Sequence, residues 1–228
     1  MKTFVIAGGL RENVIKPSSR YFGEGGRMKV GDKWVREADV HHKFGWLTVT
    51  EILAQSSNIG VTKIAFDMGA EKVWQALQDF GFGAKTGVDL PGESRGIINP
   101  LPWRPHLLSN ISFGHGIAVT PMQLASAYMA IANGGVLRKP LLVKTIRRPG
   151  SETPIHFQAE DIRRVLTPQD AATMRLMLNA ATEDKATGYL ARIPGYPVAG
   201  KTGTAQKVDA KNGGYNSNQY VSSFAGFV

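Results

Sequence analysis

The chain has 228 residues, 43% of them hydrophobic and 20% charged, a composition that fits one packed globular domain and excludes a disordered tail. It contains no cysteine, which excludes disulfide frameworks, thiolate metal sites and cysteine nucleophiles. The formal net charge is +9, but the densest basic run, residues 138–148, is interrupted by Pro140 and by apolar residues 141–143, a pattern typical of a strand with a solvated face. We therefore expect no nucleic-acid partner.

The opening residues combine Lys2 with a short apolar run from Phe4 to Leu10. This run is too short for a membrane span, which needs about 20 apolar residues, and no other stretch approaches that length. Arg11 and Glu12 stand where a signal peptide would have small residues. We expect a truncated core helix here. Residues 11–46 are rich in glycine and charge, which indicates loops and a short hairpin over 29–34.

Further helices are indicated by their capping residues. Thr48 and Glu51 have capping-box spacing, and their helix should stop at the polar trio Ser56-Ser57-Asn58. C-terminal glycines indicate helices over residues 58–68 and 70–80. Threonine caps followed by proline predict helices over 121–133 and 167–182.

The rest of the chain predicts turns and strands. Residues 82–110 contain several prolines and should form an irregular excursion, and residues 137–146 should be extended. Two strands are expected over 197–208 and 219–228, joined by a loop over 209–218 in which Asn212-Gly213-Gly214 favours a turn. Two strands make only a marginal sheet, so we expect an α/β (α+β) domain whose helices pack on an antiparallel sheet that is only partly present.

Two motifs carry candidate chemistry. Lys201-Thr202-Gly203-Thr204 lies in a predicted strand, where glycine permits close approach of a peptide, threonine hydroxyls donate hydrogen bonds and the lysine supplies charge for a carboxylate. A second copy, Lys85-Thr86-Gly87, is followed by Pro91 and is expected in a turn. Ser56-Ser57-Asn58 lies at a helix break, where it either faces a cleft or simply caps a helix. The histidines have no metal-ligand spacing, so we expect no metal and no other cofactor.

Together, a Ser-x-Asn at a helix break and a downstream Lys-Thr-Gly are two of the three motifs that define serine acyl-enzymes of the penicillin-binding and β-lactamase type. The third, Ser-x-x-Lys, is absent from the sequence. The residues from Met1 to Ala7 nevertheless resemble the helix that follows the nucleophile in that family, with Lys2 as the motif lysine. The chain also resembles division-type, class B penicillin-binding proteins in five blocks: QSSNIGV (55–61), FGFGAKTGVDLPGE (80–93), ISFGHGIAVTPMQ (111–123), ANGG (132–135) and AGKTGTAQK (199–207).

This resemblance implies a peptidoglycan D,D-transpeptidase domain that acts through a serine acyl-enzyme on D-Ala-D-Ala stem peptides and is acylated by β-lactams. It implies that the nucleophilic serine lies two residues before Met1, and that Lys2 accepts its proton. Ser56 would relay a proton to the leaving amine and Asn58 would hold Lys2 and a substrate amide. Lys201, Thr202, Gly203 and Thr204 would receive the substrate carboxylate, and the backbone N–H of Thr204 would form half of an oxyanion hole.

Residues 1–228 are then expected to be a partial transpeptidase domain that lacks the serine segment and the final strand and helix. The resemblance also implies an extracytoplasmic domain on the cell membrane, anchored elsewhere, with division-machinery membrane proteins as partners. Two alternatives stay open. One is a non-catalytic module that binds stem peptides or acts as a scaffold, and the other is a hydrolase of the D,D-carboxypeptidase or β-lactamase kind.

Overall fold

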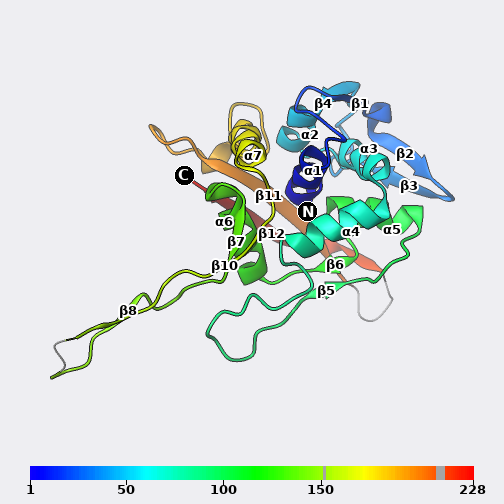
Figure 1. Ribbon diagram of the computed structural model, residues 1–228. Helices are drawn as coiled ribbons and strands as arrows, with labels where there is room; N and C mark the ends of the chain where they lie inside the picture. The colour runs from blue at the N-terminus through cyan, green and yellow to red at the C-terminus, as the bar shows by residue number, and fades with distance from the viewer. Residues whose placement is uncertain (151–152, 209–213) are drawn as a thin grey trace.

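The computed structural model describes residues 1–150, 153–208 and 214–228. Its main sheet is the antiparallel pair of β11 (Ala199–Val208) and β12 (Tyr215–Phe227), whose register aligns Lys201 with Ala225 and Gly203 with Ser223. Helix α7 packs against β11 and helix α6 against β12 (Figure 1). The expected helix-covered antiparallel sheet is confirmed.

Seven α-helices lie in the described residues: α1 (Lys2–Arg11), α2 (Val49–Ala54), α3 (Asn58–Met68), α4 (Ala70–Asp79), α5 (Pro105–Phe113), α6 (Pro121–Ala132) and α7 (Pro168–Ala180). The predicted capping signals are confirmed. Thr48 forms a capping box with Glu51 at α2, and Thr120 forms one with Gln123 at α6. These boxes satisfy backbone N–H groups that the first helical turn leaves unpaired.

Helix α1 is the centre of the hydrophobic core. Residues 3–10 are all buried, as expected of a helix that is apolar on every side. Phe4 is fully buried, and its ring centroid lies 5.0 Å from Phe80, 4.8 Å from Phe82 and 5.4 Å from Tyr128. The opening segment is therefore a core helix, and α2, α3, α4, α5 and α7 pack around it (Figure 1).

The remaining strands are short and pair in twos. They are β1 (Arg20–Phe22) with β4 (Trp46–Thr48), β2 (Arg27–Val30) with β3 (Lys33–Arg36), β5 (Ile97–Ile98) with β6 (Ile117–Ala118), β7 (Val136–Arg138) with β10 (Asp161–Arg164), and β8 (Thr145–Ile146) with β9 (Ile155–His156). The β2–β3 pair is the hairpin expected near residues 29–34. Two 3₁₀ turns, Glu24–Gly26 and Tyr189–Ala191, complete the elements of the described residues.

Three expectations need correction. The end of the expected irregular excursion is helix α5, which begins with Pro105 at its first turn, where the missing N–H of proline costs nothing. Only the ends of the 137–146 segment pair as strands, because Pro140 cannot donate to a ladder. Strand β12 begins at Tyr215, earlier than predicted. The turn expected at Asn212-Gly213-Gly214 falls mostly outside the described residues.

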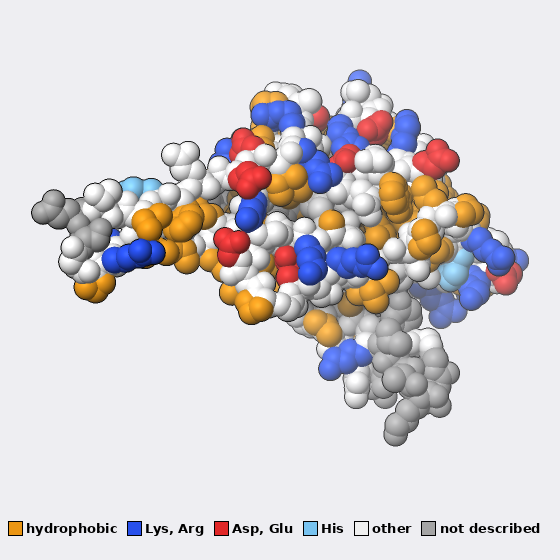
Figure 2. Space-filling model, turned by 60° about the horizontal axis from the view of Figure 1, so that its bottom comes forward, with side chains coloured by type: hydrophobic (Ala, Val, Ile, Leu, Met, Phe, Trp, Pro, Cys, Tyr) orange, Lys and Arg blue, Asp and Glu red, His pale blue; other side chains and the backbone are white. Residues whose placement is uncertain are grey.

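The segment between β7 and β10 forms a long arm that projects from the body, with β8 and β9 along it (Figure 1). Leu142, Val143, Ile155 and Phe157 of this arm are exposed. Figure 2 shows apolar and basic side chains side by side on the arm.

Candidate active site

Strand β11 carries the Lys201-Thr202-Gly203-Thr204 motif at one side of the core. Among the described residues β11 pairs only with β12, so its other edge has no strand beside it. An unpaired strand edge presents N–H and C=O groups that can bind an extended peptide. The edge therefore has the form expected of a peptide-binding strand.

Lys201 is 6% exposed, and its ammonium points to hydroxyl groups. Its Nζ donates to Thr187 Oγ1 at 2.7 Å and to Thr202 Oγ1 at 3.0 Å, with a longer contact to Thr202 O at 3.4 Å. Burial, together with the nearby charge of Lys2, lowers the pKa of Lys201 from 10.5 to about 7. A cation this destabilised would gain from a bound carboxylate, which would raise the pKa again.

Lys2 begins helix α1, and its charge acts on Lys201. Burial lowers the pKa of Lys2 to about 8, and the carboxylate of Glu37 acts in the opposite direction. The charge of Lys2 in turn adds to burial in lowering the pKa of His115. Lys2, Lys201, Glu37 and His115 thus form one electrostatic group. At pH 7 a lysine of pKa about 8 is neutral in roughly a tenth of molecules, which makes it a usable base.

The trio Ser56-Ser57-Asn58 forms the break between α2 and α3. Ser56 has φ 59°, a left-handed conformation that residues other than glycine adopt at a cost, and it turns the chain sharply. Ser57 is the helix cap: its Oγ accepts from the N–H of Gly60 at 2.9 Å. The capping function therefore falls on the middle residue, which leaves Ser56 and Asn58 to be explained.

Glu37 holds this turn, and no motif in the sequence marks it. Glu37 is 6% exposed, and its carboxylate accepts from Ser57 Oγ at 2.6 Å and from the Asn58 N–H at 2.6 Å. An anion at the start of α3 also complements the helix dipole. Its position just after β3, within a polar loop, resembles that of any surface glutamate, so only the folded contacts identify it.

The predicted residues are brought together only in part. The carboxamide of Asn58 donates to Arg36 O at 2.9 Å, and within the described residues no hydrogen bond joins it to Lys2. Ser56 lies two residues after Ala54, whose carbonyl accepts from Thr187, the partner of Lys201. Thr187 therefore contacts both Lys201 and the end of the helix that leads into Ser56.

Gly203 has a packing role on the strand. A Cβ at this position would lie 2.7 Å from Ser223 Oγ on the paired strand, closer than side chains approach. Thr202 is partly buried and bonded to Lys201, whereas Thr204 is exposed. A side chain at position 203 would therefore require the Ser223 hydroxyl to move.

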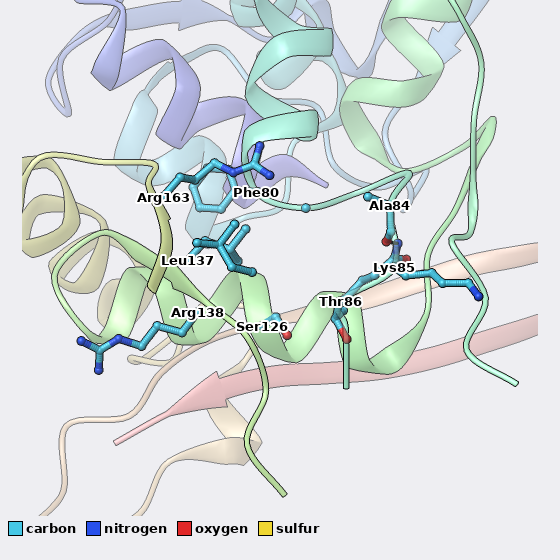
Figure 3. A pocket seen from close by; sticks show the side chains of 11 residues that line it. Phe80, Ala84, Lys85, Thr86, Ser126, Leu137, Arg138 and Arg163 are labelled. Atoms are coloured by element: carbon cyan, nitrogen blue, oxygen red, sulfur yellow. Dashed lines mark hydrogen bonds between the residues drawn. The ribbon is translucent and has the colours of Figure 1, made fainter. Parts of the chain in front are cut away.

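The second copy, Lys85-Thr86-Gly87, lies outside any strand, as expected, in an irregular segment that precedes the turn at Pro91 and Gly92. Thr86 donates through its N–H and its hydroxyl to Glu93 Oε1, at 2.7 and 2.6 Å. It lines a small cavity with Leu137 and with Ser126, whose buried Oγ has no hydrogen-bond partner among the described residues (Figure 3). The Lys85 side chain points away from this cavity (Figure 3). The copy therefore does not reproduce the Lys201 arrangement.

The fold and this site define a class of serine acyl-enzyme scaffold: a lysine at the start of a buried helix, a Ser-x-Asn turn and a lysine-bearing open strand. The family model described as penicillin binding protein transpeptidase domain matches residues 1–228. The chain belongs to the penicillin-binding protein transpeptidase family.

Individual relatives agree. Penicillin-binding protein PbpB of Mycobacterium tuberculosis is 35% identical over 210 residues, which cover 89% of this chain and 31% of that protein. The probable peptidoglycan D,D-transpeptidase PbpC of Pseudomonas aeruginosa is 34% identical over 95% of this chain and 38% of its own length. The chain thus spans about a third of the curated relatives it matches.

A solved structure of penicillin-binding protein 3 from M. tuberculosis in complex with aztreonam superposes with a TM-score of 0.88 and 32% identity, over 99% of this chain and 51% of that one. The likeness therefore extends over the whole chain and places the same fold around the site. In the described part of this chain, no helix is long and apolar enough to cross a membrane.

Proposed function

We propose that this chain is the acyl-transfer part of a peptidoglycan D,D-transpeptidase. The observation that carries the proposal is the pair of amines of Lys2 and Lys201, whose pKa values fall to about 8 and about 7, with Lys201 buried on the open strand β11. An amine that is partly neutral at pH 7 can accept a proton, and a buried cation can bind a carboxylate. A relative's name, probable peptidoglycan D,D-transpeptidase, supports the same chemistry.

In the proposed reaction, a serine two residues before Met1 in the full gene product attacks the carbonyl between two D-alanines. Lys2 accepts the serine proton, the ester bond forms, and the C–N bond to the terminal D-alanine breaks. Ser56 passes a proton to the departing amine, and Asn58 holds the substrate amide. An amine of a second stem peptide then attacks the ester, which releases the serine and completes the cross-link.

The substrate would lie along β11. Lys201, Thr202 and Thr204 bind the terminal carboxylate, and Gly203 keeps the strand close to its neighbour. The N–H of Thr204 stabilises the oxyanion, because a backbone donor fixed in a strand needs no reorganisation as charge develops. Binding of the carboxylate raises the pKa of Lys201, so substrate binding takes up a proton near pH 7.

The finer parts of the proposal come from family resemblance. We propose that β-lactams acylate the same serine, a role that the aztreonam complex of the relative from M. tuberculosis supports. We also propose an extracytoplasmic location on the cell membrane and partners among the membrane proteins of the division machinery. Residues 1–228 would be a partial transpeptidase domain, completed by the serine segment and a final strand and helix.

The proposal is tested by labelling source cells with a tagged penicillin and isolating the labelled protein that contains these peptides. Pretreatment with untagged penicillin is the control for specific labelling. We expect a species much larger than 24.7 kDa with a stable adduct on a serine two residues before Met1. An unlabelled native product of 24.7 kDa would favour a binding or scaffold module, and rapid loss of the adduct by hydrolysis would favour a carboxypeptidase or β-lactamase.

A further inference from the structure

The loop after α7, residues 183–188, joins the two halves of the candidate site. Its backbone is tied to the end of α2, because the Thr187 N–H donates to Ala54 O at 3.1 Å and Gln55 Nε2 donates to Lys185 O at 3.1 Å. It is tied to α7 as well, where the Gly188 N–H donates to Ala181 O at 3.0 Å. The loop is therefore a bridge with fixed ends.

Thr187 is the residue of this bridge that reaches the site. Its hydroxyl oxygen accepts from Lys201 Nζ at 2.7 Å and lies 3.2 Å from Ala54 O. A lysine ammonium has only donors, so the hydroxyl proton is left free to point at the Ala54 carbonyl. Two hydrogen bonds therefore run in series, from Lys201 to Thr187 and from Thr187 to the carboxyl end of α2. Each of them polarises and strengthens the other.

The hydrogen bond from Lys201 to Thr187 matters because of the surroundings of the Lys201 ammonium. Within the described residues Lys201 has no salt bridge, and its neighbours are hydroxyl groups, a carbonyl and the like charge of Lys2. A buried cation without a counter-ion depends on the hydrogen bonds made to its charged form. The bond to Thr187 is the shortest of the three.

We propose that Thr187 is a positioning residue that keeps the ammonium of Lys201 charged and aimed along β11, and that couples it through Ala54 to the turn at Ser56. This role rests on the proposed acyl-transfer function. Thr187 itself lies at the exposed edge of the site and touches no reacting atom in this assignment.

The test compares T187V and T187S in the full gene product, with T182V as the matched control. Thr182 also uses its hydroxyl in buried hydrogen bonds, to Asn179 O and Val198 O, but does not contact Lys201. The rate of acylation by penicillin is measured from pH 6 to pH 10. Thermal denaturation confirms that each variant is folded, and T187A replaces T187V if valine prevents folding.

We expect the alkaline limb of the T187V profile to move about one pH unit lower, with a roughly tenfold slower rate on that limb, because the charged form of Lys201 loses a bond. T187S should restore the profile, and T182V should lower stability without moving it. An unchanged profile in T187V, or a T187S profile that matches T187V, would overturn the assignment.

A second readout separates this role from the proposed function. The pKa of Lys201 is measured by NMR with carbon-labelled lysine, assigned with K201M, in the full product with and without T187V. A lower pKa in T187V supports the positioning role even if penicillin never labels the wild-type protein, in which case only the proposed function fails. An equal pKa in both overturns the positioning role whatever the labelling shows.

Discussion

Replacing Lys201 by methionine should stabilise the folded chain at neutral and acid pH, although it removes a residue of the candidate site. A fall in pKa from 10.5 to about 7 means that the folded state disfavours the protonated amine. At about 1.4 kcal/mol per pKa unit, this corresponds to on the order of 5 kcal/mol in the free energy of unfolding. Methionine fills a similar volume without charge, and the freed hydroxyls of Thr187 and Thr202 can turn to water.

The sign of the pH dependence follows from proton binding. Below pH 7 Lys201 is protonated in both the folded and the unfolded state, so the whole free-energy cost of burying its charge is present. Between pH 7 and pH 10.5 the unfolded chain binds more protons than the folded one, so the stability of the wild type rises with pH. Above pH 10.5 the cost is gone. The advantage of K201M should therefore shrink steadily across this window.

Urea denaturation followed by tryptophan fluorescence and circular dichroism, from pH 6 to pH 11, measures the difference directly. The control is K207M, which replaces an exposed lysine on the same strand and should change stability by less than about 0.5 kcal/mol at every pH. A K201M advantage that stays constant with pH, or a K201M chain less stable than wild type at pH 6, would refute the reasoning.

Three further perturbations test the core, a cap and the buried carboxylate. F4A should lower the free energy of unfolding by about 3–5 kcal/mol in urea denaturation, and F157A on the exposed arm by less than about 1 kcal/mol; similar losses would contradict the core assignment. T120A, which removes the cap of α6, should cost about 1 kcal/mol in the same assay, and no loss would show that the capping box is dispensable. E37Q should lower the pKa of Lys2 below its value of about 8, because a favourable negative charge is lost; an unchanged NMR titration would show that Glu37 does not act on Lys2.

The helices could be predicted closely because their signals are local. Thr48 and Thr120 are followed three residues later by a side chain that completes a capping box, and both helices begin where those residues place them. Helix α5 escapes prediction because Pro105 follows other prolines, a pattern that favours a loop, whereas it occupies the first turn of a helix.

The site could be predicted only where a motif marks it. Lys201 stands in a recognisable tetrapeptide, but its partner Thr187 lies fourteen positions earlier in a loop without a pattern. Glu37 likewise reaches Ser57 across twenty positions. Contacts of this kind depend on how the elements pack, and no local periodicity encodes them. The capping role of Ser57 differs, because its hydroxyl accepts from the N–H of Gly60 only three positions later, and serine at a helix break is a local capping signal.

The position of Phe4 links the core to the chemistry. It lies two residues after Lys2 on the same helix and is enclosed by Phe80, Phe82 and Tyr128. By packing against Phe4, these aromatic rings fix the position of the helix that carries Lys2, the proposed general base. A substitution such as F82L should therefore move Lys2 and change its basicity before it unfolds the chain.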